Sequence, residues 1–274
     1  MTFRHNTDIG QNFLRDSSVA DWMAGRALRA PGPVLEIGPG SGVLTKAILK
    51  SGCPRLDAVE LDTRLAPELE PLTKDPRFRL HWGDAVRFDY SKAGIDPVSV
   101  VANLPYHITT PVIWRMLEIY PSGRMTYMLL MTQAEAAERL SCGAGRRTSD
   151  PLSVTIAALG GASVVRKVSR SAFYPVPRVD SAIVEITLGG SNAGAKSLPA
   201  DKIWRRLLSG SFASRRKTIV NNWAASFRVT RAESAEILAR RSLGELARPE
   251  GLSLEDWLSL RGDALLEKII SGER

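Results

Sequence analysis

The fold is decided by the stretch Val34-Leu35-Glu36-Ile37-Gly38-Pro39-Gly40-Ser41-Gly42, in which a short apolar strand runs directly into glycines. The amphipathic segment that follows, Val43–Lys50, is predicted to be a helix. Glycine lets the backbone approach a ligand where a Cβ would collide. A strand, a glycine turn and a helix in this order are typical of the ligand-binding edge of an α/β sheet.

The spacing of the glycines separates two ligand classes. Dinucleotide-binding enzymes require a third glycine where this chain has Val43. The G-x-G-x-G form preceded by an acidic residue instead fits class I S-adenosylmethionine-dependent methyltransferases. Glu60 ends the next strand, where a carboxylate can accept both ribose hydroxyls. Asp84 ends the third strand, where it can accept the adenine amino group.

Apolar runs alternate with amphipathic stretches over the first two-thirds of the chain, which predicts a mostly parallel α/β sheet. The strands are expected at Val34–Ile37, Leu56–Glu60, Phe78–Trp82, Val98–Ala102, Met125–Met131, Ser163–Val168 and Ala182–Leu188. The helices are expected at Asp16–Leu28, Val43–Lys50, Leu65–Leu72, Pro111–Ile119 and Gln133–Leu140.

A flexible linker at Gly189–Gly194 ends this pattern, and only helical segments follow it. They are expected near Ile203–Ser209, Lys217–Phe227, Arg231–Arg240 and Leu254–Leu260, the last with Ser253 and Asp256 as a capping pair. The predicted fold is a Rossmann-like class I methyltransferase domain, residues 1–190, followed by a small all-helical domain, residues 191–274.

The motif Asn103-Leu104-Pro105-Tyr106 follows the fourth strand and is typical of enzymes that methylate amino nitrogens. An adenine amino group is a weak nucleophile because its lone pair is delocalised into the ring. Hydrogen bonds to the Asn103 side-chain oxygen and the Leu104 carbonyl would favour a tetrahedral nitrogen. Tyr106 offers a face on which an extruded base can stack. A second aromatic pair, Phe173-Tyr174, opens a proline-dense loop and could cover the opposite face of the base.

Charge and composition narrow the class of partner. The chain has 37 Lys and Arg against 29 Asp and Glu, a net charge of +8, which fits a polyanionic partner. Nine cations and two acids lie between Trp204 and Arg241. The cations are Arg205, Arg206, Arg215, Arg216, Lys217, Arg228, Arg231, Arg240 and Arg241. The histidines and cysteines make no metal-ligand spacing, so we expect no metal. No apolar run is long enough for a membrane helix, and no signal peptide is recognisable, so we expect a cytoplasmic protein.

Together these motifs resemble the KsgA-type (RsmA-type) family of ribosomal RNA small-subunit adenine dimethyltransferases across nearly the whole chain. The matching stretches are Gly10–Leu14, Glu36–Gly40, Val59–Asp62, Asn103–Tyr106, Phe173–Ser181 and Ser214–Ile219.

The resemblance implies transfer of four methyl groups from S-adenosylmethionine to two adjacent adenines near the 3′ end of 16S rRNA, within an immature small ribosomal subunit. It implies that the cofactor is bound by Asn12, Leu14, Gly38, Glu60, Asp84 and Asn103. Asn103 would also serve the target adenine, flanked by Tyr106 and Phe173. We expect a monomer, with RNA also bound by the helical domain.

The chain departs from the family at positions outside the cofactor motifs. His107 replaces the usual Asn, Ala134 the usual Lys, and Ser149-Asp150-Pro151 the usual Tyr-Gly-basic run. Two other functions remain open at this stage. One is a resistance-type methyltransferase of 23S rRNA, against which Leu104 and Val179-Asp180-Ser181 argue. The other is an RNA-binding assembly or transcription factor without catalysis, against which the intact motifs argue.

Overall fold

The structure, a computed structural model, describes residues 12–105, 108–119, 121, 123–189 and 193–272. The chain forms two compact units. The first comprises Met1–Glu138 and Ser163–Leu188, and the second comprises Arg139–Ala162 and Gly189–Arg274. None of the helices in the described part of the chain has both the length and the apolarity needed to cross a membrane.

The first unit is built on a seven-stranded sheet with the order β4-β3-β2-β5-β6-β9-β7. Its strands are β2 (Val34–Ile37), β3 (Leu56–Glu60), β4 (Phe78–Trp82), β5 (Ser99–Asn103), β6 (Tyr127–Gln133), β7 (Gly160–Val168) and β9 (Ser181–Leu188). β4, β3, β2, β5 and β6 run parallel to one another, and β9 is antiparallel to β6.

The strand order reverses beside β2, and this reversal positions the site. The chain runs outward from β2 through β3 to β4 and then returns to β5 on the other side of β2. Ligands of open α/β sheets bind at such a switch point, beyond the carboxyl ends of the strands. Val34–Ile37 is buried throughout because helices cover both faces of the sheet, which explains why three of its four residues are apolar and only Glu36 is polar.

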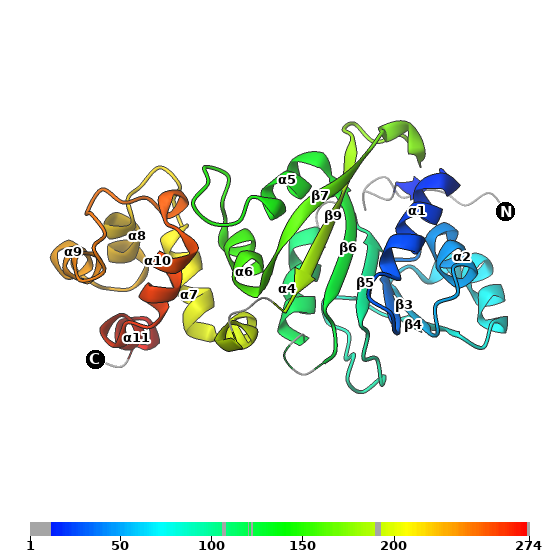
Figure 1. Ribbon diagram of the computed structural model, residues 1–274, viewed down its shortest axis with the longest axis horizontal. Helices are drawn as coiled ribbons and strands as arrows, with labels where there is room; N and C mark the ends of the chain where they lie inside the picture. Colours follow the sequence, from blue (N-terminus) through cyan, green and yellow to red (C-terminus); the bar gives the residue numbers. More distant parts are fainter. Residues whose placement is uncertain (1–11, 106–107, 120, 122, 190–192, 273–274) are drawn as a thin grey trace. The chain divides into compact units, whose positions relative to one another are not determined.

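Helices cover this sheet on both sides (Figure 1). α1 (Ser17–Ala27) and α2 (Val43–Lys50) pack together on one side, and α4 (Thr109–Ile119) lies on the other. The helix expected at Leu65–Leu72 is broken into α3 (Ala66–Leu69) between two 3₁₀ turns, Thr63–Leu65 and Glu70–Lys74. Two prolines at 67 and 71 remove the amide donors that a continuous helix would need.

A two-stranded antiparallel ribbon joins the start of the described chain to a loop far along the sequence. β1 (Phe13–Leu14) pairs with β8 (Phe173–Tyr174), with Phe13 opposite Tyr174 and Leu14 opposite Phe173. Leu14 and Phe173 belong to the hydrophobic core. The opposite face of the ribbon therefore carries Phe13 and Tyr174.

The second unit is helical and has its own core. Its helices are α6 (Pro151–Leu159), α7 (Lys202–Ser211), α8 (Ile219–Ser226), α9 (Arg231–Ala239), α10 (Leu254–Arg261) and α11 (Ala264–Ser271). Trp204, Trp223 and Trp257 are fully buried. The indole of Trp204 donates to the Thr155 hydroxyl (2.9 Å), which ties α7 to α6. Asp256 and Ser253 form the predicted capping box of α10.

The two compact units and the predicted domains divide the chain differently. The sequence places one boundary between residues 190 and 191, whereas the contacts also assign residues 139–162 to the helical unit. The reason is α6, which packs on α7 and α10. Its sequence, PLSVTIAAL, is apolar on almost every side, so its periodicity does not distinguish a buried helix from a strand.

Candidate functional site

A cavity of about 460 Å³ opens at the carboxyl ends of β2, β3, β4 and β5, all within the first unit. Its size is in the range of small-molecule sites. Pairing sets Ile37 beside Val59 and Ala102, so the residues that follow, Gly38, Glu60 and Asn103, come level at one edge of the sheet. All three line the cavity.

The glycine turn leaves room along one wall of this cavity. Gly38 and Gly40 have φ angles of +66° and +57°, in the left-handed region that L side chains avoid. A Cβ on Gly40 would lie 3.1 Å from the ring of Phe13. This wall is therefore bare backbone, as a closely held ligand requires.

Two buried carboxyl groups, Glu60 and Glu36, also line the cavity. Glu60 Oε2 accepts from the amide of Gly40 (3.1 Å) and Oε1 from the amide of Asp62 (2.8 Å). Burial raises the pKa of Glu60, and these amides oppose the rise. Burial also raises the pKa of Glu36 to about 8, against a hydrogen bond from the Thr45 hydroxyl (2.7 Å). The cavity thus presents the oxygens of two carboxyl groups to hydroxyl donors, and a bound cation would favour their ionised forms.

Asn103 contacts the segment that begins at Asn12, directly before β1. Its side-chain nitrogen donates to the carbonyl of Asn12 at 3.3 Å. That orientation leaves the side-chain oxygen as the acceptor for a ligand. Leu104 and Pro105 continue the cavity wall, and the amide of Leu104 is held by the carbonyl of Met131 (3.1 Å). The backbone of this motif is therefore anchored to β6.

Most of the described site residues predicted from sequence meet in this cavity, and Asp84 does not line it. Asn12, Leu14, Gly38, Glu60, Asn103 and Phe173 line it. Asp84 is not among the lining residues, although Gly83 and Ala85 are, and its carboxylate accepts from the amide of Val86 (2.9 Å). Tyr106 lies outside the described residues.

Three further lining residues, Phe13, Glu36 and Leu61, were not singled out for the site by the sequence. Phe13 lies inside the Gly10–Leu14 motif, and Glu36 enters the sequence argument only as a marker of the class. Leu61 is 65% exposed and lines the cavity, so its apolar side chain is accessible to a ligand there. Its place between Glu60 and Asp62 was the available clue.

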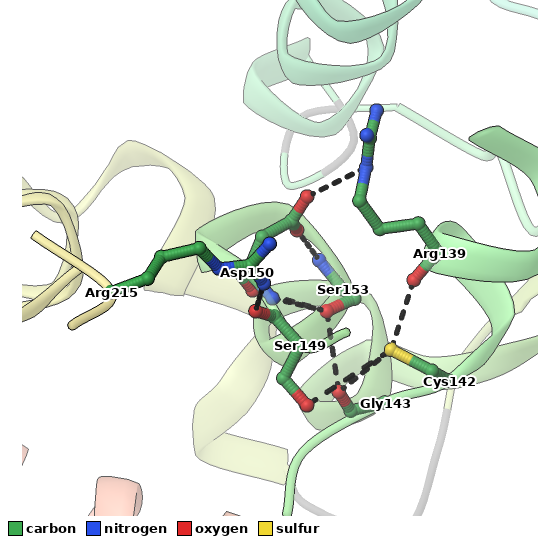
Figure 2. Close-up of polar contacts among 7 residues, drawn as sticks. All are labelled: Arg139, Cys142, Gly143, Ser149, Asp150, Ser153 and Arg215. Carbon is green, nitrogen blue, oxygen red and sulfur yellow. Dashed lines mark hydrogen bonds and ion pairs between the residues drawn. The ribbon is translucent and has the colours of Figure 1, made fainter. Parts of the chain in front are cut away.

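In the second unit, the predicted basic patch divides into cations with internal partners and cations without them. Figure 2 shows Arg215 donating to the carbonyl oxygen of Ser149 (2.5 Å), directly before the Asp150 cap of α6. The Asp150 carboxylate pairs with Arg139 at 3.1 Å. Arg241 pairs with Asp263, also at 3.1 Å. These three arginines therefore stabilise the unit itself.

The cations Arg216 and Lys217 continue the chain directly after Arg215, and Arg146 and Arg147 precede Ser149. All four are exposed, and none forms an ion pair with another residue that the structure describes. Because Arg215 donates to Ser149, the two basic segments are linked within one unit. Their charge faces solvent.

A mostly parallel sheet with this switch point, a glycine turn without a phosphate-binding cation, and acidic residues at the end of β3 (Glu60) and after β4 (Asp84) define a class I S-adenosylmethionine-dependent methyltransferase. The Asn103-Leu104-Pro105 wall fits an amino nitrogen as the acceptor.

Comparison with known proteins identifies the family. The family model described as ribosomal RNA adenine dimethylase matches residues 2–260. The chain is 38% identical over 272 residues to ribosomal RNA small subunit methyltransferase A of Pseudomonas syringae pv. syringae, covering 96% of this chain and 95% of that protein. It is 37% identical to the protein of the same name from Synechococcus, covering 97% and 96%. The chain belongs to the ribosomal RNA adenine dimethylase family.

Solved structures agree with the predicted fold. A dimethyladenosine transferase from Plasmodium falciparum is similar with a TM-score of 0.72 and 25% identity, covering 95% of this chain and 98% of that one. The 23S rRNA methyltransferase ErmE is similar with a TM-score of 0.63 and 27% identity, covering 91% and 98%. The predicted fold class, family and cofactor class are thereby confirmed, and the chain is an S-adenosylmethionine-dependent methyltransferase of adenine in ribosomal RNA.

Proposed function

We propose that this chain dimethylates the amino groups of two adjacent adenines near the 3′ end of 16S rRNA within an immature small ribosomal subunit. Its similarity to small-subunit methyltransferases over nearly the full length supports the choice of subunit. The observation that carries the proposal is the meeting of Glu60 and Asn103, from two strands, in one cavity.

The methyl donor fits the residues present. Glu60, already held by two backbone amides, presents its oxygens to ribose hydroxyls. Gly38, Leu14 and Asn12 line the same cavity and form the remaining contacts. Asp84 would reach the adenine amino group of the donor from the turn after β4, where its neighbours Gly83 and Ala85 line the cavity. When bound, S-adenosylmethionine supplies a methyl group on a positively charged sulfur, which leaves as a neutral thioether.

Catalysis by the chain is a matter of positioning the acceptor. The side-chain oxygen of Asn103 accepts a hydrogen bond from the amino group of the target adenine, and the carbonyl oxygen of Leu104 accepts a second one. These bonds favour a tetrahedral nitrogen whose lone pair faces the methyl carbon. Because the amino proton becomes acidic after attack, it can leave to water without a strong base. Phe173 forms a wall beside the base, and Tyr106 is proposed to cover its other face.

Radiolabelled S-adenosylmethionine with immature small subunits tests the proposal. We expect label in the 16S rRNA, and mass spectrometry of the nucleosides should give dimethyladenosine at two adjacent positions. Large ribosomal subunits, which contain 23S rRNA, are assayed in parallel as the alternative substrate. Label only in 23S rRNA would replace the proposal with the activity of the ErmE-like relatives. Label in neither, with intact binding of S-adenosylmethionine, would indicate an assembly factor without catalysis.

We further propose that the chain acts as a monomer in the cytoplasm, where bacterial subunits assemble. The residues that line the cavity all lie within the first compact unit of this chain. Sedimentation of the active protein over a range of concentrations tests this state. A dimer that dissociates with loss of activity would contradict it.

A further inference from the structure

Exposed apolar side chains gather in one loop beside the cavity. Among the described residues, six large apolar side chains are exposed, and three of them, Tyr174, Val176 and Val179, lie within a single stretch of six residues. Leu61, a fourth, lines the cavity itself. Such a concentration marks an interaction surface, whereas scattered single exposures do not.

The β1–β8 ribbon fixes where this loop begins. Phe173 points into the core, and its neighbour Tyr174 stands on the opposite face, 43% exposed. Its cross-strand partner is Phe13, which lines the cavity. Paired side chains on one face of such a ribbon are about 5 Å apart at their Cβ atoms. Tyr174 is therefore next to the cavity without being part of its wall.

A cation covers the ring of Tyr174. The guanidinium carbon of Arg15 lies 4.1 Å from the ring centroid. The backbone of Arg15 is anchored through its amide to the carbonyl of Ala172 (2.8 Å), which belongs to the turn that leads into β8. Arg15 is exposed and has no ion pair with any residue that the structure describes. Its charge thus remains available to a ligand.

The charges around this pair are mostly positive. Arg170 and Arg178 are exposed on the segments that flank Tyr174, also without an ion pair among the described residues. Two acidic residues lie nearby, and each accepts a hydrogen bond from a residue close to it in the sequence. Asp16 accepts from Ser18, and Asp180 accepts from the amide of Arg170 (2.9 Å). These charges favour an anionic partner over a basic or an apolar one.

We propose that Arg15 and Tyr174 form a platform on which the nucleotide adjoining the extruded adenine stacks, while the guanidinium of Arg15 contacts its phosphate. The inference rests on the proposed function, since it concerns RNA that enters the same cavity. Bases stack on tyrosine rings and on arginine planes regardless of sequence. A flat cation–ring pair beside the pocket would hold the strand in place during successive methyl transfers.

A fluorescent RNA tests this platform. The probe is a single-stranded oligonucleotide with two adjacent adenines flanked by 2-aminopurine, whose emission is quenched by stacking. With the full chain and S-adenosylhomocysteine present, we expect binding to quench the probe. Tyr174→Ala should abolish the quenching and weaken binding about 5- to 100-fold. Tyr174→Phe should restore both.

Matched variants separate stacking from charge. Arg15→Ala should reduce quenching and affinity. Arg178 is also exposed and lies in the loop that carries Tyr174, so Arg178→Ala should lower affinity through charge alone and keep the quenching. With immature small subunits, Tyr174→Ala should raise KM more than it lowers kcat. Calorimetry with S-adenosylmethionine should give wild-type affinity, since Tyr174 lies outside the cavity wall.

Wild-type quenching and affinity in Tyr174→Ala would overturn the platform. So would an unchanged KM for subunits, or equal loss of quenching in Arg15→Ala and Arg178→Ala. A defect that appears only with protein-containing particles and not with the naked probe would assign the loop to a ribosomal protein and would equally refute the inference. If the wild-type chain methylates no RNA at all, the proposed function itself fails. That outcome differs from a failure of the platform, in which the wild type is active and the variants match it.

Discussion

Glu36→Gln tests the protonation of the carboxyl group at the wall of the cavity. Glu36 is 1% exposed, and burial, aided by the charge of Glu60, raises its pKa from 4.5 to about 8. Between these values the folded chain holds one more proton than the unfolded chain. The stability contribution therefore falls as pH rises, by about 1.4 kcal/mol per pH unit at most. From about pH 6 to pH 8 the loss is about 2 kcal/mol, allowing for partial ionisation near the upper limit.

Urea unfolding of the ligand-free protein at a series of pH values measures this slope. We expect the free energy of unfolding of the wild type to fall by about 2 kcal/mol more than that of Glu36→Gln over this interval. Taking the difference at each pH cancels the titrating groups that do not interact with Glu36, and the coupling between Glu36 and Glu60 stays in the difference. Thr45→Val provides a control, because loss of the hydroxyl donor should raise the pKa of Glu36 further. Parallel profiles for wild type and Glu36→Gln would refute the argument from burial.

The same titration should appear in ligand binding. S-adenosylmethionine carries positive charge, and a cation in the cavity favours the ionised carboxylate. Its affinity for the wild type should therefore rise with pH up to about pH 8, by at most tenfold per unit. Calorimetry on Glu36→Gln should show a flatter profile. An identical pH dependence in the two proteins would place the Glu36 proton outside the binding equilibrium.

Three further perturbations test the site and the basic surface. Asn103→Ala should lower methyl transfer by at least about 100-fold while calorimetry still detects cofactor binding, and full activity would remove the proposed amino-group contact. Gly40→Ala should weaken cofactor binding tenfold or more, because its left-handed backbone costs about 1–2 kcal/mol with a side chain and the new methyl meets an aromatic ring; unchanged affinity would show that the turn is not held in this conformation. Replacing Arg216 and Lys217 together by Ala should reduce the salt slope of RNA binding by about 1.5, whereas Arg215→Ala should lower the melting temperature and leave that slope nearly intact. Equal slopes in the two variants would contradict the division of the patch.

Strand positions could be predicted from the sequence because apolar residues concentrate in the strands, although Glu36, Asp57 and Arg79 interrupt the apolar runs. Val34–Ile37, Leu56–Glu60 and Phe78–Trp82 have the predicted bounds, and the other predicted strands differ by one to three residues at their ends. Helices were harder to predict from the sequence than strands. The sequence patterns do not predict α6, which is apolar all round, or α11, and the continuous helix expected at Leu65–Leu72 is wrong because prolines interrupt it.

The residues of the cavity could be predicted where a sequence motif contains them. They could not be predicted where the packing of distant segments determines which side chains line it. Gly38, Glu60 and Asn103 were predicted individually, and their meeting follows from parallel register. Asp84 is absent from the lining residues because its carboxylate turns back to its own backbone. The sequence likewise could not tell that Arg215 is engaged by the Ser149 carbonyl, since the partners lie 66 residues apart.

By itself the sequence determined the class of sheet, the glycine turn, the identity of the acidic and amide side chains, and the family, because these depend on local residue type and order. Only the tertiary structure decided which faces those side chains take. It buried Phe173 in the core and left Tyr174 under Arg15 at the surface, and it gave Glu36 its raised pKa. These outcomes depend on strand pairing and on exclusion of water, which arise only when distant segments pack together.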